Sequence, residues 1–168
     1  MQTETSSALG GVMRDVRLAF GELLRGYKLD ADQALTIDVL FGLLGALAQA
    51  DGLVTSEEAA FVNRLMDELD LSTRARELAN DAFLRGRRKQ LDVDAEITRY
   101  LTRYPKGTPE VTRLYDTVVR LAAADQRLRP AERVFLERFT ANLGFSPVAL
   151  EVKLKQVMPD APSKTSKT

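Results

Sequence analysis

Four acidic residues, Asp51, Glu58, Asp125 and Glu132, have types and a spacing that suit the binding of a metal ion. In both pairs the glutamate follows the aspartate by seven residues, and the second pair lies 74 residues after the first. The chain contains no cysteine and no histidine. Any metal must therefore be held by oxygen ligands, which favour calcium, and also magnesium or manganese. The same absence excludes a Ser-His-Asp triad, a cysteine nucleophile and a zinc finger.

The aspartates and the glutamates occupy different positions relative to the helices that we expect. Asp51 and Asp125 each end an apolar run, where the helix dipole disfavours a negative charge by about 0.3–1 kcal/mol. Such a residue needs a partner, which is either the amides of the following turn or a bound cation. Glu58 and Glu132 fall in a first helical turn, where the dipole stabilises a carboxylate. Helix stabilisation alone therefore explains the glutamates as well as a metal site does.

Helices must position these acids, because apolar residues recur every three or four positions nearly throughout the chain and no strand pattern occurs. The sequence predicts an all-α protein. Ser72 and Asp92 are suitable N-caps, Thr108-Pro109 and Ser146-Pro147 are typical helix starts, and residues 55–58 have the form of a capping box. We expect helices over residues 12–26, 31–50, 55–69, 72–86, 92–104, 109–124, 130–143 and 147–158.

An internal repeat relates two parts of the chain. Residues 41–61 match residues 115–135 in register, so that each copy has an apolar helix ending in Ala-Asp, a short turn and a second helix. Repeat halves at about 35–86 and 109–158 can pack around an approximate twofold axis. The inward-facing positions predict a core that includes Leu43, Leu47, Phe61, Leu65, Leu121, Phe135 and Phe139.

Composition limits the location and the partners of the protein. The 24 basic and 24 acidic residues cancel, which gives no overall attraction to nucleic acid or anionic lipid. Residues 39–48 are apolar but too few to span a bilayer, and residues 1–11 lack the pattern of a signal peptide.

We expect a bacterial-type cytoplasmic protein with a flexible N-terminus over residues 1–11, a helical domain over 12–158 and a disordered tail over 159–168. The basic cluster formed by Arg85, Arg87, Arg88 and Lys89 is expected to be a solvated helix end.

At about residues 35–158 the chain resembles the TerB-like family, whose fold occurs in the tellurite-resistance protein TerB and in a domain of DjlA co-chaperones. The resemblance implies a seven- to eight-helix bundle with a pseudo-twofold and an acidic metal site drawn from both repeats, at the four acids named above. Gln126 departs from the pattern, since the first copy has Gly52 there. Without histidine the chain lacks the His-Pro-Asp tripeptide of a J domain, so a stand-alone TerB-like domain is expected. The residues that carry the resemblance are Ala50-Asp51-Gly52, Glu58, residues 65–72, Ala82-Phe83, Gly86, Ala124-Asp125, Glu132 and residues 143–146.

These observations predict a non-enzymatic, metal-responsive interaction module of the stress response, with protein partners that the sequence does not name. Two alternatives are open. The acids can be purely structural, since Arg127 and Arg129 flank Asp125 and can neutralise it while the glutamates cap helices. A carboxylate-based metallohydrolase would need two metal ions and a water-activating group, for which the chain offers few further ligands.

Overall fold

The computed structural model describes residues 11, 13–21, 29–51, 56–124 and 127–159, and their side chains except at 51 and 56–59. Within these ranges the chain is helical and contains no strand, so the predicted all-α class is confirmed. Residues 13–21 form a helix that we call the N-terminal helix. The expected flexible N-terminus and all but the first residue of the expected tail lie outside the described residues. The helices that follow are α2 (Ala31–Asp51), α3 (Ser56–Glu68), α4 (Thr73–Arg87), α5 (Val93–Arg103), α6 (Pro109–Ala122), α7 (Pro130–Asn142) and α8 (Pro147–Val157).

The helix starts follow the capping residues of the sequence. The side chains of Ser72, Asp92 and Ser146 each accept a hydrogen bond from the backbone N–H three residues later, at 3.2–3.3 Å, which satisfies a donor that has no partner within the helix. Thr108 occupies the N-cap of α6, but its hydroxyl makes no capping hydrogen bond. The capping box expected at residues 55–58 lies partly outside the described residues.

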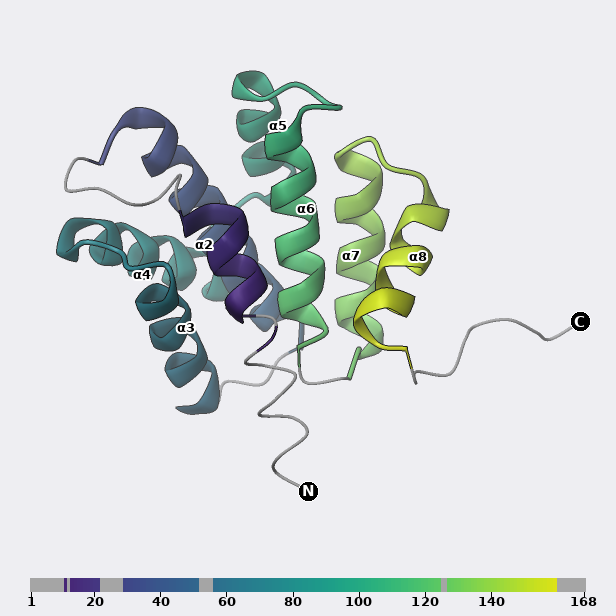
Figure 1. Ribbon diagram of the computed structural model, residues 1–168, viewed down its shortest axis with the longest axis horizontal. Helices are drawn as coiled ribbons and strands as arrows, with labels where there is room; N and C mark the ends of the chain where they lie inside the picture. The colour runs from purple at the N-terminus through teal and green to yellow at the C-terminus, as the bar shows by residue number, and fades with distance from the viewer. Residues whose placement is uncertain (1–10, 12, 22–28, 52–55, 125–126, 160–168) are drawn as a thin grey trace, which may run out of the picture.

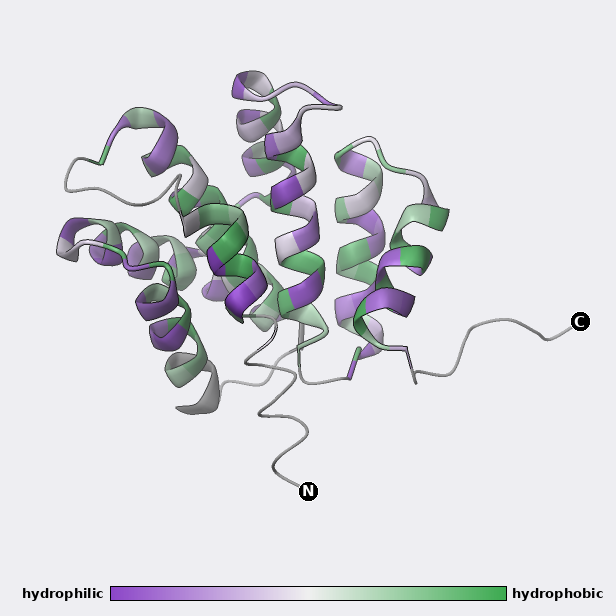
Figure 2. Cartoon of the chain, viewed as in Figure 1, coloured by the Kyte–Doolittle hydropathy of each residue, from purple (hydrophilic) through white to green (hydrophobic). Residues whose placement is uncertain are grey.

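Helix α2 is the central element of the fold. It contacts α4 most extensively and also contacts α5, α6 and α7, whereas α8 packs on α6 and α7 (Figure 1). Figure 2 shows hydrophobic residues concentrated where α2 and its neighbours meet, with hydrophilic residues on much of α4 and α5. By length and composition α2 could cross a membrane, but about 67% of its most apolar stretch is buried by other helices. It has the surroundings of a core helix.

Two glycines bring the backbones of α2 and α4 into direct contact. A Cβ atom at Gly45 would lie 2.1 Å from the carbonyl oxygen of Phe83, and one at Gly86 would lie 2.2 Å from the oxygen of Gly42. Real Cβ atoms do not approach other atoms so closely, so only glycine fits at both positions. Small residues on α4, including Ala79 and Ala82, continue this close contact.

The core contains most of the residues expected in it. Leu43, Leu47, Leu65, Leu121 and Phe139 are all buried. Phe61 and Phe135 are only partly buried, and they pack against the edge of the core. These two phenylalanines occupy equivalent positions of the expected repeat, near the start of α3 and α7. The pseudo-twofold axis itself stays a prediction.

Candidate functional site

Three of the four predicted acids belong to helix ends, and these helix ends lie on one side of the molecule. Asp51 is the last residue of α2, Glu58 is in the first turn of α3 and Glu132 is in the first turn of α7. In Figure 1 the ends of α2 and α6 and the starts of α3 and α7 all lie at the lower edge of the view. Asp125, in the connection between α6 and α7, lies outside the described residues. The fold thus brings the helix ends that carry three of the acids to one end of the protein.

Glu132 is the one predicted acid whose side chain is described. Its Oε1 atom accepts a hydrogen bond from the backbone N–H of Arg129, at 3.2 Å. The sequence lacks a serine or threonine at residue 129, and for that reason no capping box is expected there. Glu132 nevertheless makes the glutamate half of that motif. This contact satisfies a backbone donor at the start of α7 that has no partner within the helix.

Among the described side chains, no group of three or more acids could hold a metal ion. The side chains of Asp51 and Glu58 and all of Asp125 lie outside that description, so this result does not bear on the predicted site. The fit of a metal therefore rests on donor chemistry. Four carboxylates and the backbone carbonyls of two helix ends are oxygen ligands of the kind that calcium prefers.

A further charged cluster, which the sequence did not predict, lies in the N-terminal half of α2. Asp38 is only 8% exposed, and it forms ion pairs with Arg85 of α4 and Arg99 of α5. Arg99 also pairs with Glu96, in the first turn of its own helix. Burial lowers the pKa of the Arg99 guanidinium, but its hydrogen bonds to Asp38 and Glu96 outweigh this effect and raise the pKa overall. The cluster joins three helices and contains equal numbers of acids and bases.

Arg85 is therefore not simply part of a solvated basic cluster, as the sequence suggested. Its guanidinium crosses to α2 and compensates the one charged residue within the apolar run Thr36–Leu40. The sequence feature that could have predicted this ion pair is the charge of Asp38 in an otherwise apolar helix, because a buried carboxylate requires a partner. The sequence could not say which of 24 basic residues supplies it.

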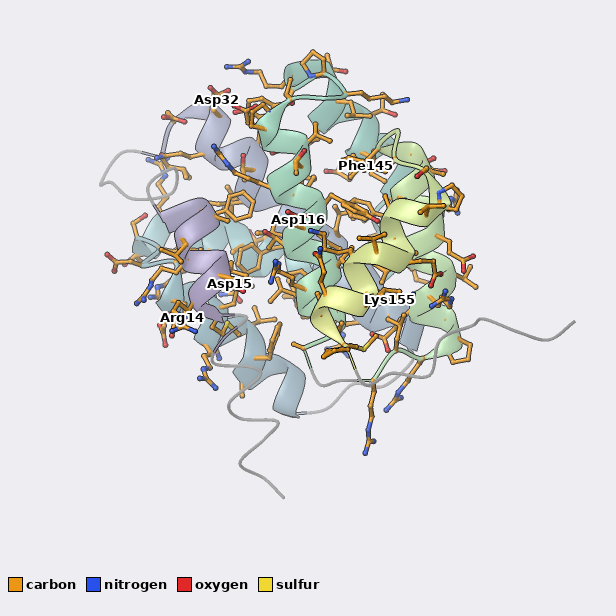
Figure 3. All side chains as sticks on the ribbon, turned by 45° about the vertical axis from the view of Figure 1, so that its right-hand side comes forward. Arg14, Asp15, Asp32, Asp116, Phe145 and Lys155 are labelled. Carbon is orange, nitrogen blue, oxygen red and sulfur yellow. The ribbon has the colours of Figure 1, made fainter. Side chains whose placement is uncertain are left out.

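A second connection between α2 and α5 is exposed to solvent. Arg103 holds Asp32 through two hydrogen bonds of 2.8 and 2.9 Å, near the top of the molecule in Figure 3. These hydrogen bonds lower the pKa of the Asp32 carboxyl below its ordinary value. The guanidinium of Arg103 also lies 4.8 Å from the ring centre of Tyr104. Both charged groups of this pair serve the packing of helices, and neither faces the predicted metal site.

The described part of the fold defines a class of all-α proteins in which helices pack around one central apolar helix, α2. A family model for the tellurite resistance protein TerB matches residues 37–154, which is most of the chain. The chain belongs to the TerB family. The match begins within α2 and ends within α8, so the N-terminal helix lies outside it.

The chain is also similar to several curated co-chaperones. It is 30% identical over 115 residues to the co-chaperone protein DjlA of Vibrio cholerae, which covers 68% of this chain and 40% of that protein. It is 29% identical over 131 residues to DjlA of Haemophilus influenzae, or 78% of this chain and 46% of that protein. The chain thus spans less than half the length of these relatives. No solved structure gives a significant match.

Proposed function

We propose that this chain is a non-catalytic TerB-type interaction module that binds a divalent cation, calcium in first place, through Asp51, Glu58, Asp125 and Glu132. The observation that carries the proposal is the arrangement of helices: three of the four acids stand at helix ends that lie at one end of the fold. Membership of the TerB family supports the assignment.

The electrostatics of this arrangement favour a bound cation. Four carboxylates close together repel one another, and some of them would take up protons unless a positive charge compensated them. Asp51 adds a second cost, since it is the last residue of α2 and stands at the negative end of the helix dipole. A divalent cation removes both costs at once.

A thermal melt with and without metal tests the proposal. Calcium at a hundredfold excess over its dissociation constant should stabilise the folded protein by about 2.7 kcal/mol, or about 5–10 °C in Tm for a chain of this size. The double variant Asp51→Asn with Asp125→Asn should lose this shift, because an amide is a weaker ligand for a hard cation. Magnesium and manganese, measured in parallel, rank the preferred metal.

The control is Asp81→Asn, which removes a carboxylate from the exposed face of α4, away from the predicted site. This variant should keep the full response to calcium. If millimolar calcium, magnesium and manganese all leave the Tm of the unmodified protein unchanged, the metal proposal is wrong. The acids would then be structural, and Asp125 would be compensated by neighbouring arginines.

The interaction role is supported by the relatives, which are named as co-chaperones, a class of protein that acts on other proteins. We infer that this chain likewise works by binding a protein partner, in the cytoplasm and in a stress response. Survival of cells with and without the chain under tellurite tests the role in stress. A carboxylate-based metallohydrolase is the second candidate, and metal-dependent hydrolysis of a phosphodiester that disappears in the double variant would favour it.

A further inference from the structure

The N-terminal helix is seated in a groove of the helical domain. Met13, Val16 and Phe20 are each at most 1% exposed, and their spacing of three and four residues places them on one face of the helix. The opposite face carries Leu18, which is 74% exposed. Figure 1 shows this helix in front of α2, between α3 on one side and α6 on the other.

Charges of opposite sign mark the two edges of this groove. On the α6 edge, Arg120 donates a hydrogen bond of 2.9 Å to Asp15 of the N-terminal helix. On the α3 edge, a nitrogen of Arg17 lies 3.9 Å from an oxygen of Glu68. Figure 3 shows Asp15 on the side of the N-terminal helix that faces α6. The groove therefore selects a helix with an acidic residue on one side and a basic residue on the other.

The N-terminal helix does not fill the groove. A cavity of about 460 Å³ separates it from the end of α3, and the lining residues are Arg17, Gly21, Arg64, Asp67, Glu68, Leu69 and Asp70. A Cβ atom at Gly21 would meet only the Cγ of Arg17, at 3.6 Å. Three acids and two arginines line the cavity, and Arg76 already holds one of the acids, Asp67. A longer basic side chain in place of Gly21 would both fill the cavity and balance its charge.

Packing against the helical domain holds this helix in place. It lies outside the part of the chain that matches the TerB family. Its two ion pairs are partly exposed, and exposed ion pairs contribute little. The three buried apolar side chains are the main attachment.

We propose that the groove between α3 and α6 is a docking site for an amphipathic helix of a partner protein, and that the N-terminal helix is its intramolecular occupant. The partner helix carries apolar residues at positions i, i+3 and i+7, which correspond to Met13, Val16 and Phe20. It carries an acid at i+2, the position of Asp15. It carries basic residues at i+4 and i+8, the positions of Arg17 and Gly21. This inference rests on the proposed interaction role and adds the site and the chemistry of the partner.

The test measures binding of a labelled peptide to the full chain by fluorescence anisotropy. The peptide has the sequence of residues 8–24 with Gly21→Lys. Two chain variants shift the equilibrium between the docked and the undocked N-terminal helix in opposite directions. Phe20→Ala removes its largest anchor and should raise the apparent affinity for the peptide at least tenfold, because the peptide competes with a weakened occupant. Gly21→Ala favours the helical conformation, and its Cβ would make only an ordinary contact with the Cγ of Arg17, at 3.6 Å. This variant should lower the affinity for the peptide about two- to fivefold.

Charge reversal at the α6 edge checks where the peptide binds. Arg120→Glu in the Phe20→Ala chain should weaken binding of the peptide. A second peptide that carries Asp15→Arg should bind this variant with the affinity restored. If circular dichroism shows that Phe20→Ala does not fold, the test rests on the peptide affinity of Gly21→Ala, which should be lower than that of the unmodified chain. All titrations are run in EDTA and in calcium, so that failure of the metal proposal leaves the groove testable.

Three results would overturn the proposal. The first is a peptide that binds no form of the chain, and the second is one that binds all forms equally. The third is exchange of the N-terminal helix between two copies, visible as a dimer of Phe20→Ala in size-exclusion chromatography, since the occupant would then be a second copy of this chain.

Discussion

At the scale of single residues, the glycines at the contact between α2 and α4 leave the least space for a larger side chain. Gly86 is buried, and a Cβ there would meet backbone atoms of Gly42, Gly45 and Ala46 at 2.2–3.0 Å. Backbone atoms inside a helix cannot move aside as the tip of a flexible side chain can. A single methyl group at this position must therefore separate the two helices.

We predict that Gly86→Ala lowers the free energy of unfolding by about 1–3 kcal/mol, measured by urea denaturation. The loss should occur although alanine is the better helix former by about 0.5–1 kcal/mol. The matched control is Gly21→Ala, a helical glycine whose added Cβ would make only an ordinary contact, 3.6 Å from the Cγ of Arg17, and this variant should keep or raise the stability. Equal effects of the two substitutions would contradict the close approach of α2 and α4.

At the scale of elements, the third helices of the two expected repeat halves pack differently. Helix α4 buries small residues against α2, whereas α8 buries Leu150 and Leu154 and leaves Val148 67% exposed. The sequence match between the halves holds as far as Ser72 and Ser146, which cap these helices, and the pattern of buried residues diverges beyond them. Equivalent caps thus start two helices whose packing faces differ.

The cap of α4 can be tested by itself. Ser72→Ala removes the hydrogen bond from the N–H of Ala75 to the Ser72 hydroxyl, at 3.2 Å. We predict a loss of about 0.5–2 kcal/mol in the free energy of unfolding. Thr108→Ala is the matched control, since Thr108 occupies the N-cap of α6 without a capping hydrogen bond, and it should cost less. A larger loss for Thr108→Ala in urea denaturation would show that the caps were assigned wrongly.

At the scale of the whole molecule, buried tyrosines make stability depend on pH in the alkaline range. Burial raises the pKa of the Tyr100 phenol and of the Tyr115 phenol. Tyr100 donates a hydrogen bond to the carbonyl oxygen of Glu110, and Tyr115 shares one with Thr140. The folded protein therefore keeps phenolic protons that the unfolded chain releases near pH 10.

We predict that the free energy of unfolding falls as the pH rises above about 10. A group whose pKa is raised in the folded state stabilises it fully below the pKa of the unfolded state, and this contribution is lost at higher pH. Each such tyrosine should add a slope of about 1.4 kcal/mol per pH unit. Urea denaturation between pH 8 and 11 measures the slope, and Tyr100→Phe should reduce it. A stability that does not change with pH over this range would contradict the burial of these phenols.

The sequence by itself determined the local features of this protein. Apolar periodicity placed the helices, Ser72, Asp92 and Ser146 marked three of their starts, and the acids at the helix ends suggested a site. These features depend on residues a few positions apart, whose contacts a helix fixes. Only the tertiary structure decided that Asp38 meets Arg85 and Arg99, 47 and 61 residues away, and that α2 and α4 touch through glycine. It also decided that the N-terminal helix lies between α3 and α6, because such contacts depend on how helices cross, which no local pattern encodes.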